Sequence, residues 1–106
     1  MFVSVIIPCY NGEAYIGQTI GSLLEQTRHA DEIIVVDDGS THNSAGIARR
    51  FGDSVKVLSK KNEGASTARN FGAEHAKGDA LMFLDADDVL GPTALEALVA
   101  HLENSN

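Results

Sequence analysis

The sequence has few cysteines, few basic residues and no long apolar run, and each shortage excludes a class of protein. Cys9 is the only cysteine among 106 residues, which excludes a disulfide framework and a thiolate metal site. Eight basic residues against fifteen acidic ones give a net charge of −7, which argues against a nucleic-acid partner. No apolar run approaches the roughly 20 residues that span a bilayer, and residues 2–8 lack the length and basic flank of a signal peptide. We therefore expect a cytoplasmic protein, although a longer parent chain could be membrane-associated.

The hydrophobic pattern predicts one α/β domain over residues 1–106. Apolar runs predict strands at residues 3–8, 32–37, 55–58 and 80–85. Helical spacing predicts helices over residues 12–27, from the 38–41 loop to 51, over 65–77 and from 92 onward. Asn11 is the expected cap of the first helix, and Gly52 and Gly78 are the expected stops of the second and third. Strands alternating with helices predict a Rossmann-like parallel sheet with helices on both faces.

Acidic residues follow two of the predicted strands. Asp37 and Asp38 follow the second strand, and the D-x-D triplet Asp85-Ala86-Asp87 follows the fourth. Open α/β folds bind ligands at the carboxyl ends of their strands, and alternate side chains of an extended segment face the same way. Oxygen ligands favour Mg²⁺ or Mn²⁺ shared with phosphate. Taken alone, a D-x-D triplet also fits a helix start, and an Asp in Asp-Gly-Ser also fits a turn that bonds its own backbone.

Two nucleotide-binding motifs are missing, and two further residues have open roles. The first turn, Pro8–Glu13, has no G-x-G-x-x-G, and no G-x-x-x-x-G-K-[ST] occurs, which excludes a dinucleotide site and a P-loop. Tyr10 could stack on a base or fill the sheet edge. Arg69 lies near a predicted helix start, where a cation is unfavourable, so either an anionic partner or solvent surrounds it.

Four segments together resemble the N-terminal half of a family 2 glycosyltransferase with the GT-A fold. They occur in the order and spacing of that family and span essentially the whole chain, namely residues 3–11, 34–40, 62–72 and 83–88. The resemblance implies a nucleotide-diphosphate-sugar donor, with UDP favoured by family tendency. It also implies a divalent metal, Mg²⁺ or Mn²⁺. The sugar would be transferred with inversion to an acceptor that the sequence does not identify.

The resemblance also implies roles for individual residues. Pro8 and Tyr10 would frame the nucleoside, with Glu13 close to it. Asp38 would read the base edge, and Arg69 would approach the base or the diphosphate. Asp85 would bind ribose, and Asp87 would ligate the metal, with Asp88 behind it.

No residue of the chain matches the catalytic base of the resembled family. In that family, the base lies well beyond the D-x-D along the sequence. We therefore expect a truncated donor-binding part that transfers sugar poorly alone and self-associates through an uncovered edge or face. Two alternatives remain. A non-catalytic nucleotide- and metal-binding module could use the same crevice. A sugar-nucleotide pyrophosphorylase would also carry acids at strand ends, but it would open with a Gly-rich basic loop that Pro8–Asn11 does not provide.

Overall fold

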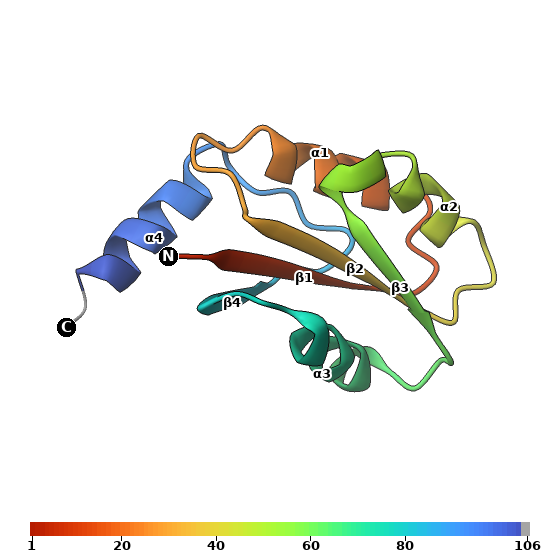
Figure 1. The fold of residues 1–106 in the computed structure, drawn as a ribbon. Coiled ribbons are helices and arrows are strands. Elements are labelled where there is room, and N and C mark those ends of the chain that lie inside the picture. The colour runs from red at the N-terminus through yellow and green to blue at the C-terminus, as the bar shows by residue number, and fades with distance from the viewer. Residues whose placement is uncertain (105–106) are drawn as a thin grey trace.

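A four-stranded parallel sheet lies between two layers of helices in the computed structural model, which describes residues 1–104 (Figure 1). The strand order is β3-β2-β1-β4, and every pairing is parallel. The strands are β1 (Val3–Cys9), β2 (Glu32–Asp38), β3 (Lys56–Lys60) and β4 (Ala80–Phe83). The helices are α1 (Ile16–Leu24), α2 (Ser44–Arg49), α3 (Ala65–His75) and α4 (Ala94–Glu103), with a 3₁₀ turn, η1, at Gly52–Ser54. The predicted α/β fold is confirmed.

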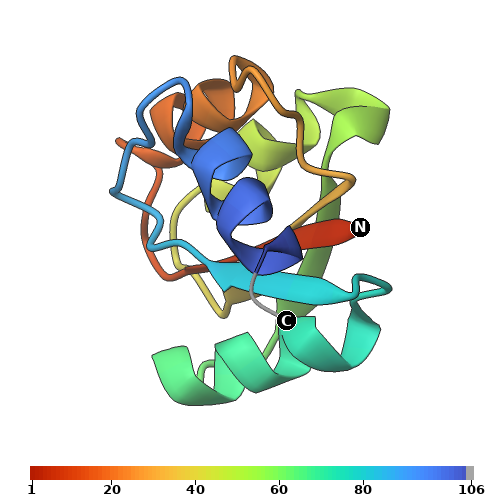
Figure 2. The same cartoon turned by 90° about the vertical axis from the view of Figure 1, so that its left-hand side faces the viewer.

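The two central strands, β1 and β2, are buried on both faces. Alternate residues of β1, among them Val5 and Ile7, face the layer that contains α1, α2 and α4. Ile6, together with Ile34 of β2, faces α3 on the other side. Figure 2 shows α3 by itself below the sheet and the other helices above it. Continuous apolar runs are needed in these strands because both of their faces are covered.

Helix α3 packs very close to the sheet because it presents Gly72 there. A Cβ added at Gly72 would lie 2.5 Å from Cγ2 of Ile6 and 3.0 Å from Cγ2 of Val36. Ala68, one turn earlier on the helix, is fully buried against the same two strands. The small residues bring the N-terminal end of α3 to the carboxyl edge of the sheet.

Strand β4 is shorter and more exposed than the sequence predicts. It ends at Phe83 rather than residue 85, and Leu81 and Phe83 are 42% and 45% exposed. Their register partners on β1 are Ser4 and Ile6, which place both side chains on the α3 side of the sheet. β4 lies at the edge of the described sheet, and α3 covers β1 and β2 instead. The strand therefore alternates in burial, as a strand with one covered face does.

Three helices begin later than predicted. α1 begins at Ile16 and not at residue 12, because Asn11 does not cap it. Asn11 has a φ of 50°, and its Oδ1 accepts a hydrogen bond from the Thr41 amide at 2.8 Å. The Asn11 side chain thus joins two loops at the carboxyl edge of the sheet. α2 and α4 begin at Ser44 and Ala94.

The two glycines that were predicted to end helices, Gly52 and Gly78, differ in conformation, and neither directly follows a helix. Gly52 has a φ of +65°, the left-handed conformation that a helix stop requires, but α2 ends at Arg49, so Gly52 lies three residues beyond the helix and begins η1. Gly78 is not in the left-handed region, and α3 already ends at His75. A Cβ at Gly78 would lie 2.5 Å from Oγ of Ser4, so close packing accounts for that glycine. Among the described helices, none is long and apolar enough to cross a bilayer.

Candidate functional site

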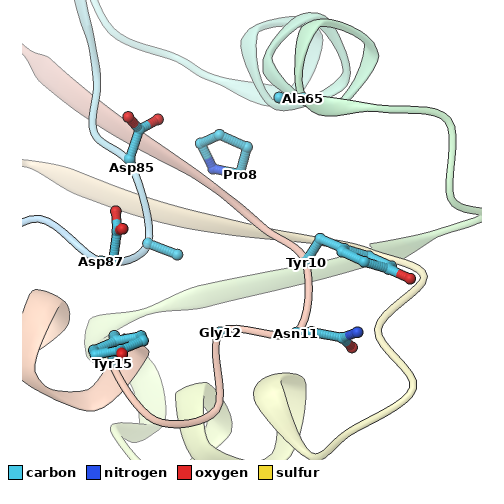
Figure 3. Close-up of a pocket in the computed structure, with 9 residues that line it drawn as sticks. Pro8, Tyr10, Asn11, Gly12, Tyr15, Ala65, Asp85 and Asp87 are labelled. Atoms are coloured by element: carbon cyan, nitrogen blue, oxygen red, sulfur yellow. The ribbon is translucent and has the colours of Figure 1, made fainter.

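A cavity of about 310 Å³ opens at the carboxyl edge of the sheet (Figure 3). It lies where β1 and β4 end and where α1 and α3 begin, so four elements contribute to its walls. The lining residues are Pro8, Tyr10, Asn11, Gly12, Tyr15, Ala65, Asp85, Ala86 and Asp87. Four of the residues predicted from the sequence, Pro8, Tyr10, Asp85 and Asp87, are thus brought to one cavity.

A tight turn after β4 gathers the carboxylates of the D-x-D segment. The amide of Asp88 donates a hydrogen bond to the carbonyl of Asp85 at 3.0 Å. Oxygen atoms of Asp85, Asp87 and Asp88 lie within 4.8 Å of one another, and all three residues are exposed. The expectation of an extended strand end here is wrong, because β4 has already ended at Phe83. The turn, rather than strand alternation, brings the acids together.

The donor set of this turn fits a hard divalent cation. Carboxylate oxygens suit Mg²⁺ and Mn²⁺, which usually take only one or two protein carboxylates and complete their shells with water and phosphate oxygens. The exposure of the three acids leaves room for those further ligands. Asp88, which the sequence analysis placed behind the metal ligand, belongs to the cluster as much as Asp87 does.

Arg69 approaches the same turn from α3. Its Nη2 lies 3.6 Å from Oδ1 of Asp85, and the two side chains are 38% and 61% exposed. Of the alternatives left open for Arg69, a specific partner or solvent, the structure shows a carboxylate partner from this chain and a side chain that is still partly exposed. Arg69 does not line the main cavity but lies beside it.

Asp38 lies at a second, smaller cavity of about 60 Å³ that also contacts Pro8, Tyr10 and Ala65. Asp38 is 3% exposed, and its carboxylate already accepts three hydrogen bonds. Oδ1 accepts from the Lys60 ammonium at 3.2 Å and from the Glu63 amide at 3.0 Å, and Oδ2 accepts from the Gly64 amide at 3.0 Å. Asp38 thereby holds the loop that leads into α3.

These partners keep Asp38 ionised. Burial alone would raise the pKa of Asp38, but the hydrogen bonds from Glu63, Lys60 and Gly64 together hold that pKa below its ordinary value. Lys60 responds in the opposite direction: its hydrogen bond to Glu63, at 2.9 Å, and its pairing with Asp38 raise the pKa of the ammonium group. The loop from Lys60 to Gly64 is therefore a charged clamp around one carboxylate.

Asp37 has the role that the turn interpretation predicts. Its Oδ1 accepts a hydrogen bond from the Ser40 amide at 3.1 Å, three residues later in the chain. Asp37 is 9% exposed, and it does not line either cavity at this edge of the sheet.

Two tyrosine rings flank the main cavity. Tyr10 and Tyr15 are 53% and 55% exposed, and Figure 3 shows them at separate corners of the site, with Pro8 between Tyr10 and Asp85. The sequence interpretation missed Tyr15, together with Asn11, Gly12 and Ala65. Their position between the end of β1 or β3 and the first residue of the next helix is the signal that could have found them, because these connections form the ligand edge of parallel sheets.

Glu13 and Cys9 take no part in the main cavity. Glu13 is exposed on the loop between Tyr10 and Tyr15, and it is not among the lining residues. Cys9 is 1% exposed, and burial raises the pKa of its thiol, so it is a structural residue under the loop.

An acidic, open cavity at the carboxyl edge of a parallel sheet, with aromatic rings beside a carboxylate cluster, defines an α/β ligand-binding domain. The chain belongs to glycosyl transferase family 2, whose family model matches residues 4–106. It is 45% identical over 100 residues to the uncharacterized glycosyltransferase YibD of Escherichia coli (strain K12). It is 36% identical over 108 residues to the glycosyltransferase GlyG of Streptococcus pneumoniae serotype 4.

Solved structures of GT-A glycosyltransferases have the same fold. Residues 1–349 of TarS from S. aureus, crystallised in complex with UDP-GlcNAc, match 97% of this chain at 32% identity and a TM-score of 0.90. The mannosyltransferase PcManGT from Pyrobaculum calidifontis, in complex with GDP-Man and Mn²⁺, matches 97% at 27% identity and a TM-score of 0.90.

The chain spans about a third of each of these matched chains. The match to YibD covers 92% of this chain and 29% of YibD. The match to GlyG covers 98% of this chain and 36% of GlyG. The chain covers 31% of the TarS chain and 32% of the PcManGT chain.

Proposed function

We propose that residues 1–106 bind a nucleotide-diphosphate sugar together with Mg²⁺ or Mn²⁺ and form the donor-binding part of an inverting glycosyltransferase. One observation carries the proposal: the 310 Å³ cavity joins two exposed tyrosines to a turn whose three carboxylates have oxygens within 4.8 Å. Aromatic rings suit a base, and a carboxylate cluster suits a cation bound to diphosphate. The UDP-GlcNAc and GDP-Man complexes of similar proteins support the ligand class.

Asp87, with Asp88 and Asp85 beside it, is the proposed cation ligand. A bound divalent cation supplies charge neutralisation for the departing diphosphate. Asp85 has a second assigned role toward the ribose hydroxyls, which its 61% exposed side chain leaves possible. Arg69 lies beside the same turn, 3.6 Å from Asp85, and is proposed to meet the base or the diphosphate. The Mn²⁺ of the PcManGT complex supports a divalent metal in this kind of site.

The nucleoside half of the ligand is assigned to Pro8, Tyr10 and Asp38. The proline and the tyrosine border both cavities, so a base between them would lie against apolar atoms and one ring. Asp38 has two oxygens with about four acceptor positions, of which three are filled. The remaining position on Oδ2 is proposed to accept an imide N–H of the base, and uracil offers such a group. UDP is therefore the first nucleotide to test.

Transfer itself needs a base that deprotonates the acceptor hydroxyl. The carboxylates of the described site are already assigned to the donor and the cation, and the acceptor class stays open. We therefore propose donor binding, with slow transfer, as the activity of this chain. The non-catalytic alternative uses the same cavity, and a nucleotide-sugar turnover assay separates the two.

Self-association is proposed for the exposed side of β4. Phe2, Leu81 and Phe83 are 38%, 42% and 45% exposed, and the outer edge of β4 has no partner among the described strands. An apolar strip beside an open strand edge favours pairing with a second copy.

Isothermal titration calorimetry with UDP, in the presence and absence of Mn²⁺, tests the donor-site proposal. We expect UDP binding that strengthens with Mn²⁺, and we expect Asp87→Ala to remove the metal-dependent part. Asp53→Asn, which neutralises an exposed acid on η1, is the matched control and leaves binding unchanged. Equal UDP affinity with and without Mn²⁺ in the wild-type chain would contradict the role of Asp87.

A further inference from the structure

Polar side chains on one face of α1 hydrogen-bond to the segment from Ala86 to Leu95, which begins within the carboxylate turn. Thr19 and Ser22 lie on α1 and Gln26 lies just beyond it, at intervals of three and four residues that share one helix face. Thr19 is fully buried, and Gln26 is 2% exposed. Four side-chain hydrogen bonds cross to the segment: Thr19 to the Ala86 carbonyl, the Leu90 amide to Ser22, Gln26 to the Gly91 carbonyl, and the Leu95 amide to Gln26.

The first of these bonds reaches the middle of the D-x-D triplet. Oγ1 of Thr19 donates to the Ala86 carbonyl at 2.7 Å, and its other acceptor, the Tyr15 carbonyl, is further away at 3.2 Å. The Ala86 carbonyl belongs to the peptide plane that joins Ala86 to Asp87. Fixing that plane fixes the positions of the Asp87 amide nitrogen and Cα, from which the Asp87 side chain leaves the backbone.

A second contact holds the same residue from the β1–α1 loop. Gly12 is buried, and a Cβ added there would lie 3.3 Å from Cβ of Ala86 and 2.9 Å from Sγ of Cys9. Ala86 is thus packed against the loop on one side and hydrogen-bonded to α1 through its carbonyl. Close packing against buried groups leaves a turn few other conformations.

We propose that Thr19 is a positioning residue for the carboxylate turn, acting through the Ala86 carbonyl to set the spacing of the Asp85, Asp87 and Asp88 oxygens. The inference rests on the proposed metal and donor site. The Thr19 hydroxyl touches neither cation nor nucleotide, and its role is to pre-organise the groups that do. Outer partners of metal ligands commonly change metal affinity by about 10- to 100-fold when they are removed.

Ser22 supplies the matched comparison. Its Oγ accepts from the Leu90 amide at 3.2 Å, so it holds the same segment four residues beyond Ala86. Removing either hydroxyl deletes one side-chain hydrogen bond from α1 to this segment. Only the Thr19 bond lies within the carboxylate turn.

The experiment compares Thr19→Val, Thr19→Ser and Ser22→Ala with the wild-type chain. Mn²⁺ binding in the presence of UDP is measured by calorimetry, and folding is checked by thermal unfolding. We expect Thr19→Val to weaken Mn²⁺ binding about tenfold or more. Thr19→Ser keeps the hydroxyl, and Ser22→Ala leaves the Thr19 bond in place. The Mn²⁺ affinity of each should stay within about twofold of wild type. Unchanged Mn²⁺ affinity in Thr19→Val, or an equal loss in Ser22→Ala, overturns the proposal.

A second readout works without any ligand. The Asp88 amide closes the turn by its bond to Asp85, so its hydrogen exchange, followed by NMR, reports how firmly the turn is held. We expect faster exchange at Asp88 in Thr19→Val and wild-type exchange in Thr19→Ser. If the wild-type chain binds neither UDP nor Mn²⁺, the proposed function fails, and Asp88 exchange still decides whether Thr19 holds the turn. Wild-type exchange at Asp88 in Thr19→Val overturns the proposal.

Discussion

The guanidinium group of Arg69 lies 3.6 Å from the carboxylate of Asp85, and this contact joins α3 to the turn after β4. The two residues are sixteen positions apart in the sequence, where Arg69 precedes strand β4 and Asp85 follows it. The contact places one positive charge beside a cavity whose wall carries carboxylates. A diphosphate entering this cavity would meet both that charge and the proposed cation.

Arg69→Ala should therefore weaken UDP binding. Hydrogen bonds to charged groups contribute about 1.5–3 kcal/mol, so we expect a loss of roughly ten- to a hundredfold in UDP affinity in the presence of Mn²⁺. The measurement is calorimetric titration. Arg50→Ala, which removes an exposed arginine at the end of α2, is the control and should bind UDP as wild type does. Equal affinity in the Arg69 variant would remove Arg69 from the donor site.

Tyr10→Ala should also weaken UDP binding, because the ring is proposed to stack on the base. Stacking of a base on an aromatic side chain contributes about 1–3 kcal/mol, so we expect a loss of roughly five- to a hundredfold. Tyr10→Phe keeps the ring and should bind normally. Tyr15 is equally exposed and lines the same cavity, so Tyr15→Ala is the informative comparison. A loss in the Tyr15 variant alone would move the stacking role to that ring.

Asp38→Asn should destabilise the fold near neutral pH and reduce its sensitivity to acid. Since the folded-state pKa of Asp38 is below its ordinary value of 3.8, its contribution is present above that pH and is lost as the pH falls through the folded value. With hydrogen bonds to a charged group removed, we expect the free energy of unfolding at pH 7 to fall by about 2 kcal/mol. Urea unfolding between pH 7 and pH 3 is the measurement. Asp53→Asn should follow the wild-type profile.

Gly72→Ala should destabilise the chain, whereas Gly21→Ala should not. A Cβ at Gly72 would press on Ile6 and Val36, while a Cβ at Gly21 meets nothing within 4 Å. Overpacking of this kind costs about 1–3 kcal/mol. Replacing an unhindered helical glycine by alanine gains about 0.5–1 kcal/mol. Urea unfolding of the two variants measures both effects, and a stable Gly72→Ala protein would show that α3 can move away from the sheet at little cost.

Phe83→Lys should reduce self-association of the chain. The substitution places a charge in the exposed strip of β4, and charged side chains at a sheet edge oppose pairing with another copy. Sedimentation velocity over a range of concentrations is the measurement. Leu24→Lys, which changes a 39% exposed residue on α1, is the control. A wild-type chain that stays monomeric at high concentration would contradict the self-association proposal itself.

The sequence predicted the layers of the fold well because burial leaves a clear pattern in β1 and β2. Their apolar runs are continuous, as expected of strands covered on both sides. The run before Asp85 looked the same, yet Leu81 and Phe83 are exposed. An apolar residue shows that a position can be buried, but whether a neighbouring element covers it depends on the whole fold.

The helix starts and part of the site could not be predicted, because they depend on contacts between distant loops. Asn11 has the side chain of a helix cap, but that side chain bonds to Thr41, thirty residues away. Asp38 was predicted to face a base, and the structure shows that most of its acceptor capacity already serves the Lys60–Gly64 loop. Residue type and local spacing do not reveal which of two such partners a polar group takes.

Strand β1 precedes the other described strands along the chain but lies inside the sheet, with β2 on one side and β4 on the other. Its β4 side stays open until residues 80–83 exist, and the carboxylate turn follows directly after them. During synthesis, three strands can therefore assemble well before any cation site does. The ability to bind Mn²⁺ with UDP would then mark chains in which β4 has docked against β1, which makes it a reporter of that docking step.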